Sequence, residues 1–363
     1  MGKGKAVGIA FIGCGNISGP YADSVLTHPD ELRLIGAYDL VRERAESFAK
    51  KYNCVAFESM EQVLSSKDVE LVVNLTIHTA HAQVTRRALE AGKHVHSEKP
   101  LATNREDGNF LVDLAMKKKL LLGCSPFVIL GEAQQTLWKA VRDGVVGQVL
   151  YVSSDMMHGR IESWHPSPEA FYAQGAGPML DVGCYPLNVI TSILGPVRSV
   201  RGQAKVLIPR REIGSGPKKG KVFSVTTPDH VDGVLEFSNG VIGRLSASFV
   251  VEKSAHAGIE ITGSLGTLRV DSPVNFDSQV FFCPIGKREW TPLPMLAKPY
   301  NGVEWSRGLL DIADAIDKGR QPRCSGEQAN HILDICLSIL EASELGREVR
   351  LSTTFKAPEP VYV

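Results

Sequence analysis

The order of apolar and polar positions separates the chain into two parts. Over residues 1–126, short apolar runs alternate with amphipathic segments. The apolar runs predict strands at 7–12, 32–38, 54–57, 69–76, 94–97 and 120–124, and the amphipathic segments predict helices at 42–52, 81–91 and 105–119. This alternation is typical of a doubly wound α/β domain, in which helices cover both faces of a parallel sheet.

Beyond residue 127, apolar and polar residues alternate one by one along the apolar runs. Two such runs flank Asn239-Gly240, a dipeptide typical of a tight hairpin. In the second run Val241, Leu245 and Phe249 fall on one face, and polar residues fall on the other. Strands are expected at 231–237, 241–249, 259–262 and 267–270, and helices at 133–142, 309–317 and from the Ser325/Gln328 capping box to near 346. The part at 127–363 is therefore predicted to be an α+β domain with a large, mostly antiparallel open sheet.

One segment of this second part departs from both patterns. Residues 209–221 are rich in Gly, Pro, Arg and Lys, which predicts an exposed loop.

Composition excludes several classes of protein. The formal net charge is zero and no basic stripe is present, so a nucleic-acid partner is not expected. No apolar run approaches the length of a membrane span. Seven cysteines occur without a Cys-x-x-Cys pair, which argues against a disulfide framework or a zinc site and favours a reducing cytoplasm.

The strand at 7–12 leads into a glycine-rich turn, Gly13-Cys14-Gly15-Asn16-Ile17-Ser18. Gly13 permits the tight turn, and Gly15 leaves room for a pyrophosphate at the start of the next helix. Ser18 occupies the place of the third glycine of the usual fingerprint. Asp39 ends the second strand at about the distance expected for a ribose-binding carboxylate. The pattern predicts a dinucleotide site, and an ordinary turn with a surface Asp is the alternative.

Asp39 also predicts which dinucleotide binds. Its carboxylate accepts hydrogen bonds from both ribose hydroxyls and repels a 2′-phosphate, so NAD is favoured over NADP. Arg42 and Arg44 follow closely and weaken that preference.

Glu98-Lys99-Pro100 follows the strand at 94–97, and ligands of open α/β sheets bind at the carboxyl ends of the strands. Burial readily lowers the pKa of a lysine, which suits Lys99 to proton transfer. A solvated surface lysine is the alternative, and position alone does not decide between the two.

A second cluster lies at 175–188. A helix that begins near Pro178 places Asp181, Tyr185 and Asn188 on one face, because the three residues are spaced at i, i+4 and i+7. An acid, a phenol and an amide on one face suit the binding of a polyol and the transfer of a proton. The alternative is the polar outer face of an amphipathic helix.

The loop at 156–166 carries side chains suited to carbohydrate: His158, Arg160, Trp164 and His165. The indole stacks on an apolar sugar face, and the other three form hydrogen bonds with hydroxyl groups. The spacing of the two histidines fits no standard metal motif, so no metal site is expected. A loop packed by its own Trp164 is the alternative.

Together these segments resemble the Gfo/Idh/MocA oxidoreductase family, which is named after glucose–fructose oxidoreductase and inositol dehydrogenase. The resemblance covers nearly the whole chain. Its most specific motifs are 91–102, which contains Glu98-Lys99-Pro100, and 177–185, which contains Asp181-Val182-Gly183-Cys184-Tyr185. It implies a Rossmann domain followed by an α+β domain whose open sheet forms subunit contacts.

The resemblance also implies roles for individual residues. Lys99, Asp181 and Tyr185 match the positions that surround the reacting sugar carbon, and Tyr185 stands where many members have His. Thr76, His78 and His81 match a family loop that touches the cofactor. Glu98 and Lys99, in their own segment, are also expected to contact the cofactor. His78 reaches the nicotinamide ribose or only fills the loop, and His81 is expected to cap the following helix.

The expected function is that of an NAD-dependent oxidoreductase, which transfers a hydride between nicotinamide and a ring carbon of a sugar, glycoside or polyol. Two alternatives stay open. One is a redox-neutral enzyme that retains its NAD, either a sugar–sugar oxidoreductase or a redox-assisted glycosidase. The other is a non-catalytic NAD-sensing co-regulator, which the presence of Lys99, Asp181 and Tyr185 disfavours. A homo-oligomer built on the second domain's sheet is also expected, because a sheet face is stable only when covered.

Overall fold

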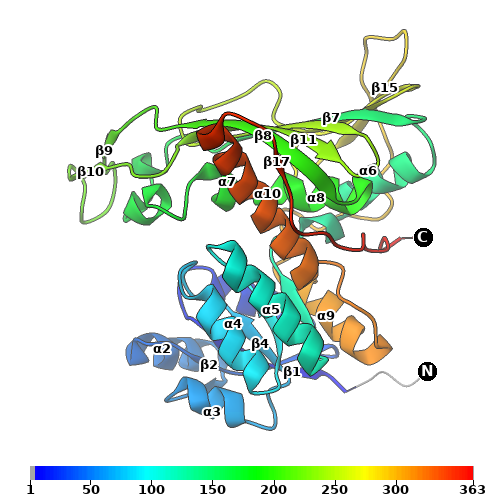
Figure 1. Cartoon of the computed structure of the whole chain (residues 1–363). Helices are drawn as coiled ribbons and strands as arrows, with labels where there is room; N and C mark the ends of the chain where they lie inside the picture. The colour runs from blue at the N-terminus through cyan, green and yellow to red at the C-terminus, as the bar shows by residue number, and fades with distance from the viewer. Residues whose placement is uncertain (1–4, 363) are drawn as a thin grey trace. The chain divides into compact units, whose positions relative to one another are not determined.

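The computed structural model describes residues 5–362, so residues 1–4 and 363 of the two predicted domains lie outside the described part. The chain forms two compact units (Figure 1). The first unit extends to Phe127 and also contains Glu304–Asn330. The second unit contains Val128–Val303 and the residues from His331 onward.

A six-stranded parallel sheet forms the centre of the first unit, as predicted. Its strands are β1 (Val7–Ile12), β2 (Leu32–Tyr38), β3 (Val55–Ala56), β4 (Leu71–Asn74), β5 (His94–Ser97) and β6 (Leu122–Cys124). Their order is β3-β2-β1-β4-β5-β6, the doubly wound arrangement in which the strand order reverses at β1 and β4. β1 is buried along its whole length because helices cover both faces of a parallel sheet.

The helices of this sheet are α1 (Ser18–Val25), α2 (Arg42–Tyr52), α3 (Met60–Ser65), α4 (His81–Glu90) and α5 (Arg105–Lys118). Side-chain caps explain two of the starts. Ser59 accepts a hydrogen bond from the backbone N–H of Gln62, and Asn104 accepts one from that of Asp107. The sequence pattern missed α3, whose six residues are too few to show helical periodicity.

The segment Glu304–Asn330 packs with the first unit, whereas the sequence pattern assigned it to the part at 127–363. Trp305 explains this placement, because its ring lies 5.5 Å from that of the buried Tyr21. The Ser306 hydroxyl also lies 2.8 Å from that of Ser24. The segment continues into α9 (Arg307–Lys318) and the start of α10 (Gly326–Leu345). The Ser325 hydroxyl caps α10, as predicted, by accepting a hydrogen bond from the Gln328 N–H.

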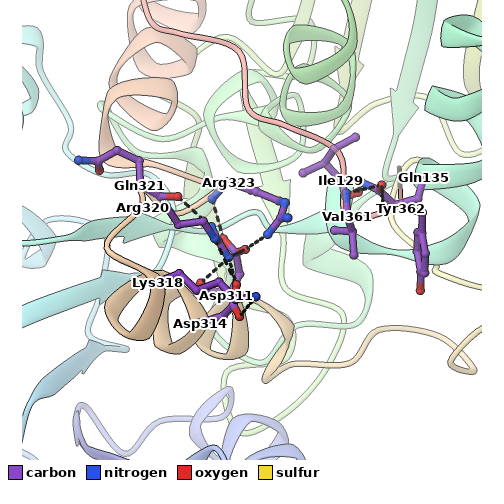
Figure 2. A network of polar contacts seen from close by, with 10 residues as sticks. All are labelled: Ile129, Gln135, Asp311, Asp314, Lys318, Arg320, Gln321, Arg323, Val361 and Tyr362. Carbon is purple, nitrogen blue, oxygen red and sulfur yellow. Dashed lines mark hydrogen bonds and ion pairs between the residues drawn. The ribbon is translucent and has the colours of Figure 1, made fainter. Parts of the chain in front are cut away.

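Ion pairs hold the turn between α9 and α10. The buried carboxylate of Asp311 accepts hydrogen bonds from Arg320 at 2.7 Å and from Arg323 at 2.6 Å (Figure 2). Arg320 also contacts Asp314 at 2.6 Å. These contacts fix the turn within the first unit.

The second unit is built on a nine-stranded sheet ordered β16-β15-β14-β13-β7-β12-β11-β8-β17. All neighbouring pairs are antiparallel except β12 with β7, so the sheet is mostly antiparallel, as predicted. The strands are β7 (Val149–Met157), β8 (Val197–Lys205), β11 (His230–Phe237), β12 (Ile242–Ser248), β13 (Gly258–Gly263), β14 (Gly266–Val270), β15 (Val280–Pro284), β16 (Thr291–Pro292) and β17 (Val349–Arg350).

Val241, Leu245 and Phe249 are buried, as their alternation predicts. The unit also contains α6 (Glu132–Arg142), α7 (Pro178–Asp181), α8 (Cys184–Leu194) and the 3₁₀ turns η1 (Val128–Leu130), η2 (Ile161–Ser163) and η3 (Pro168–Tyr172). The buried amide of Gln135 in α6 donates to the Ile129 carbonyl and accepts from the Val361 N–H, which anchors the end of the chain (Figure 2).

The prediction of a plain exposed loop at 209–221 is wrong at its start. β9 (Arg210–Glu212) pairs with β10 (Val222–Ser224) as a two-stranded sheet. The Arg211 side chain is buried because it meets acidic partners from other segments, which composition alone does not reveal.

Candidate functional site

The turn after β1 has the form that a dinucleotide requires. Gly13 has a φ of +101°, and a Cβ there would lie 2.6 Å from the Leu75 carbonyl oxygen. A Cβ on Gly15 would meet nothing within 4 Å and would instead fill the open space in front of the turn. Asn16 and Ile17 lead from that space into α1, and Ser18 is buried with its hydroxyl donating to the Gly15 carbonyl at 2.7 Å. Ser18 thus replaces a third glycine without loss of the turn.

The Asp39 carboxylate is held against this turn by backbone groups. Its Oδ2 accepts a hydrogen bond from the Cys14 N–H and its Oδ1 accepts one from the Val41 N–H, both at 2.8 Å. Each carboxylate oxygen has a further lone pair, so the group remains able to accept hydrogen bonds from a diol.

Four neighbouring parallel strands end at the same edge of the sheet. β1 is followed by Gly13, β2 by Asp39, β4 by the segment that contains Thr76, and β5 by Glu98. This edge is where open α/β sheets bind ligands. The open space at Gly15, the N-terminus of α1 and the fixed Asp39 carboxylate together fit the pyrophosphate and ribose of a dinucleotide.

Arg42, which is close to Asp39 in the sequence, pairs with two glutamates. Its Nε lies 2.7 Å from the carboxylate of Glu46, and its Nη2 lies 3.8 Å from that of Glu58. Leu40, directly after Asp39, is almost fully exposed. Arg44 is exposed as well.

Glu98 is clamped by residues that sequence reasoning missed. Its Oε1 accepts hydrogen bonds from the Tyr21 hydroxyl at 2.6 Å and from the Ser125 hydroxyl at 2.9 Å. Its Oε2 accepts one from the Lys99 N–H at 3.1 Å. The carboxylate is therefore fixed at the start of the Glu98-Lys99-Pro100 segment. Tyr21 and Ser125 gave no sequence signal, because each lies inside an ordinary helix or strand-end pattern.

His96 lies beneath this clamp. Its Nε2 is 3.2 Å from the Ser125 hydroxyl oxygen, and its Nδ1 is buried without a hydrogen-bond partner among the described residues. Burial lowers the pKa of His96 to about 4. The ring is therefore neutral at pH 7 and donates from Nε2 to Ser125, which leaves the Ser125 hydroxyl hydrogen for Glu98.

The prediction that His81 caps the following helix is wrong, because Ala80 occupies the cap position of α4. The buried ring lies between two carbonyl oxygens, with Nδ1 2.7 Å from Pro100 O and Nε2 3.1 Å from Thr76 O. Burial lowers its pKa, so the neutral ring donates to one of them. The His81 ring therefore lies against both the segment after β4 and the segment after β5.

The segment after β4 is also held from below. The buried Asn74 amide donates to the His81 carbonyl at 3.0 Å and accepts from the Thr76 hydroxyl at 2.7 Å. Asn74, like Tyr21 and Ser125, was not identified from the sequence. Thr76 and His78 are half-buried in this segment.

In the second unit, the predicted single helix from Pro178 through Asn188 is wrong. The structure has α7 and α8, which are interrupted at Val182 and Gly183. Pro186 explains the interruption. It has no N–H to donate, and inside a continuous helix its ring would clash with the carbonyl of Val182, whereas the first turn of a new helix accepts it.

The three residues that were expected on one helix face belong to two helices. Asp181 ends α7 and Tyr185 lies in the first turn of α8, and both are half-buried. Asn188 is buried, and its Oδ1 accepts a hydrogen bond from the Ile129 N–H at 3.0 Å. Asn188 thus anchors η1, and its amide oxygen is already engaged.

The loop after β7 brings three of its four predicted residues together. The Trp164 ring, 54% exposed, lies 6.0 Å from the His158 ring and 5.5 Å from the His165 ring, both edge-on. Both rings stand nearly perpendicular to the indole, and about half of the Trp164 surface stays exposed. Arg160 is directed elsewhere, with its Nε 3.4 Å from the Glu252 carboxylate.

Two negative findings concern residues 5–362 only. No helix there is both long and apolar enough to cross a membrane. No group of three or more His, Cys, Asp or Glu side chains there is arranged to hold a metal ion.

Two family models match the chain. Residues 7–125 match an oxidoreductase family with an NAD-binding Rossmann fold, and residues 134–269 match the GFO/IDH/MocA C-terminal domain. Together the two matches span more than half of the 363 residues.

Curated relatives give the same picture. The chain is 28% identical over 273 residues to dTDP-3,4-didehydro-2,6-dideoxy-alpha-D-glucose 3-reductase of Streptomyces violaceoruber, which covers 74% of this chain and 73% of that protein. It is 26% identical over 302 residues to 1,5-anhydro-D-fructose reductase of Ensifer adhaerens, with 81% and 84% covered.

A solved structure shares the fold. The WlbA dehydrogenase of Bordetella pertussis, crystallised in complex with NADH and UDP-GlcNAcA, superposes with a TM-score of 0.77. The match covers 96% of this chain and 98% of that chain at 19% identity.

Proposed function

Because the chain belongs to the Gfo/Idh/MocA oxidoreductase family, we propose that it transfers a hydride between NAD and a ring carbon of a sugar, glycoside or polyol. The observation that carries this proposal lies in the first unit. The Gly13–Ile17 turn, Asp39 and Lys99 follow β1, β2 and β5, three parallel strands that end at one edge of the sheet. When bound, the nicotinamide supplies the hydride chemistry, and the protein supplies binding, orientation and proton transfer.

Residues of this edge hold the dinucleotide. Gly13, Gly15, Asn16 and Ile17 form the pyrophosphate cradle, and Asp39 accepts hydrogen bonds from the ribose hydroxyls. NAD is preferred over NADP, because Asp39 repels a 2′-phosphate and Arg42 is paired with Glu46. Thr76, His78 and Glu98 lie on the segments that follow β4 and β5. His81 acts from beneath, through its contacts with the Thr76 and Pro100 carbonyls.

Three residues act on the reacting hydroxyl group of the substrate. Lys99 donates a hydrogen bond to the substrate oxygen, Tyr185 gives and takes the proton, and Asp181 holds the hydroxyl in place. Lys99 belongs to the first unit, and the other two belong to the second. His158 and His165 are the alternative bases if Asp181 is protonated.

The loop after β7 binds the sugar ring. Trp164 offers a half-exposed indole, and the rings of His158 and His165 beside it supply hydrogen-bonding groups. Arg160 also belongs to this site, where it would act from its place beside Glu252. The relatives named above are reductases of a didehydro-dideoxy-glucose nucleotide and of an anhydro-fructose, which supports a carbohydrate substrate. Asn188 also belongs to the proposed substrate site, with its amide oxygen holding η1.

A homo-oligomer forms through the open face of the second unit's sheet. Tyr151, Val234 and Ile242 are exposed there, and Tyr151 pairs with Ile242 on neighbouring strands. A second copy would cover this face. Sedimentation at micromolar concentration is expected to show an oligomer, and an Ile242→Glu variant is expected to dissociate. No disulfide joins any of the seven cysteines, all of which lie within residues 5–362, and this supports a cytoplasmic location.

The direct test is a panel of monosaccharides, inositols and glycosides scanned for NADH absorbance, first with the wild-type protein and then with Lys99→Ala. We expect Lys99→Ala to lower turnover on the order of 10²–10⁴-fold with NAD affinity unchanged. Lys67→Ala, an exposed lysine of the same unit, is the matched control.

The same panel separates the alternatives. Near-native turnover by Lys99→Ala would refute the lysine's role. NAD that co-purifies and exchanges slowly, together with transfer between two sugars, would identify the redox-neutral enzyme. NAD binding with no turnover on any sugar would identify the sensor.

A further inference from the structure

A buried ionic cluster lies beneath the candidate sugar-binding loop. The Arg211 side chain on β9 is 1% exposed. Its Nη1 lies 2.6 Å from Glu162 Oε1, and its Nη2 lies 2.6 Å from Asp229 Oδ2. Its guanidinium carbon lies 4.6 Å from the centre of the Tyr172 ring. One cation therefore meets two carboxylates and an aromatic face.

The partners of Arg211 come from both ends of the loop. Glu162 lies in η2, two residues before Trp164, and Tyr172 ends η3. The Tyr172 hydroxyl donates to the other carboxylate oxygen of Glu162. Glu162 and Tyr172 therefore fix both ends of the stretch that carries Trp164 and His165, and Arg211 contacts both.

The rest of the β9–β10 hairpin follows the same loop. The Gly214 N–H donates to the Glu162 carbonyl at 2.7 Å, and the Ser215 hydroxyl donates to the Trp164 carbonyl at 2.7 Å. The hairpin is held in turn by Asp229, whose two carboxylate oxygens accept from the Leu207 and Ile208 N–H groups. Arg211 is the point at which hairpin, loop and sheet are joined.

Stability alone is a weak reason for such a cluster. Removing two carboxylates and a guanidinium from water is costly, and well-packed apolar residues often stabilise a fold equally well. The Nε of Arg211 is, moreover, buried without a hydrogen-bond partner among the described residues. A guanidinium does provide geometry, because N–H groups on different nitrogens of one rigid plane fix two partners at once.

We propose that Arg211 is a positioning residue for substrate recognition: it sets the place of Trp164 and His165 through Glu162 and Tyr172, and so determines sugar affinity and selectivity. This inference rests on the proposed function, since it assigns the loop to the sugar. Arg211 itself touches neither the sugar nor the dinucleotide. Its loss therefore changes KM and selectivity and leaves the hydride step intact.

The test compares Arg211→Lys with the wild-type protein. Lysine keeps the charge but lacks the fork, so Glu162 and Asp229 can no longer both be held. KM for the best sugar is expected to rise on the order of tenfold. The kcat is expected to stay within about twofold, with NADH affinity unchanged. The ratio of kcat/KM between that sugar and its epimers is expected to fall.

Tyr172→Phe is a milder variant, which removes only the hydroxyl bond to Glu162 and keeps the charge cluster. It is expected to shift KM in the same direction by a smaller factor. Arg198→Lys, in an exposed pair with Glu236 on the nine-stranded sheet of the same unit, is the matched control and is expected to change nothing. Unchanged KM and selectivity in a folded Arg211→Lys, or a loss of kcat at constant KM, overturns the proposal.

A readout without substrate keeps the two proposals apart. Amide hydrogen exchange in 158–172 is expected to quicken in both variants, while exchange in β11 stays at the wild-type rate. Unchanged exchange in 158–172 overturns the positioning role even if no sugar is a substrate. Faster exchange in a protein that oxidises no sugar would support the positioning role of Arg211 and refute the proposed function instead.

Discussion

The hydroxyl of Tyr21 donates a 2.6 Å hydrogen bond to Oε1 of Glu98, although 77 residues separate them in the chain. Tyr21 is buried on α1, directly after the dinucleotide turn, and Glu98 opens the segment that carries Lys99. The bond therefore joins the helix that faces the pyrophosphate cradle to the segment that carries the candidate catalytic lysine. A charge-assisted bond of this kind contributes about 1.5–3 kcal/mol.

Removing this hydroxyl should disturb Lys99 more than the dinucleotide. In Tyr21→Phe, Glu98 Oε1 keeps only the Ser125 hydroxyl, so the segment after β5 loses part of its support. We expect kcat to fall by about tenfold with NAD affinity nearly unchanged, measured by steady-state kinetics and by NADH titration.

Tyr52→Phe is the control for that variant. Its ring is also buried in the first unit, and its hydroxyl contacts Lys51 and the Gly19 carbonyl rather than Glu98. It is expected to keep the wild-type kcat. Equal kcat values for Tyr21→Phe and the wild-type protein would show that the clamp does not act on Lys99.

Asp39 should decide the choice of cofactor. Asp39→Asn removes the charge that attracts the two ribose hydroxyls and repels a 2′-phosphate, while an amide oxygen can still accept from Cys14 or Val41. NAD is expected to bind at least tenfold more weakly, since each charge-assisted bond contributes about 1.5–3 kcal/mol. NADP binding is expected to stay the same or tighten.

Calorimetry with both dinucleotides checks this expectation. Glu43→Gln, in the first turn of α2, loses one negative charge close by and is expected to leave the ratio of the two affinities unchanged. A wild-type protein that binds NADP as tightly as NAD would contradict the preference.

Tyr185 should control proton transfer. Tyr185→Phe removes the only proton-bearing group of that side chain, so turnover is expected to fall on the order of 10²–10⁴-fold, and the basic limb of the pH–rate profile should disappear. Tyr300→Phe, at an exposed tyrosine of the same unit, is the control. His158 and His165 variants are expected to raise KM instead. A Tyr185→Phe enzyme with most of its turnover would assign the proton to another group.

His331 should make the fold sensitive to acid. Its Nε2 accepts the Val197 N–H at 3.0 Å, so the neutral ring carries its hydrogen on Nδ1, opposite the Thr353 hydroxyl. Burial lowers the pKa of His331 to about 4, below the value near 6.5 expected in the unfolded chain. The unfolded chain therefore binds this proton first, and stability is lost as the pH falls from about 6.5 to 4.

At 1.36 kcal/mol per pKa unit, the loss is about 3 kcal/mol at most. His331→Gln keeps an acceptor and a donor but does not titrate, so its acid limb should be flatter by that amount. Denaturant unfolding between pH 4 and 8 measures this, and the exposed His256→Gln is the control. A variant whose stability falls with pH as steeply as the wild-type protein would assign the acid limb to other groups.

The chain itself determined the nucleotide-binding edge of the first unit. The turn at Gly13, the acid at Asp39 and the lysine at Lys99 each follow a strand whose apolar run is readable, and parallel strands bring their carboxyl ends to one edge whatever the rest of the fold does. The alternation at 241–249 determined its buried face in the same local way.

Only the tertiary structure decided which distant side chains meet. Tyr21 with Glu98, and Arg211 with Glu162 and Asp229, are pairs whose members belong to different elements. Pro186 is a sequence signal for the interruption at Val182, but the i, i+4, i+7 spacing of the polar residues favours a single helix. Trp305 joins the first unit because it packs beside Tyr21. Periodicity reports which face of an element is buried, whereas a buried charge or ring is placed by the partners that packing brings to it.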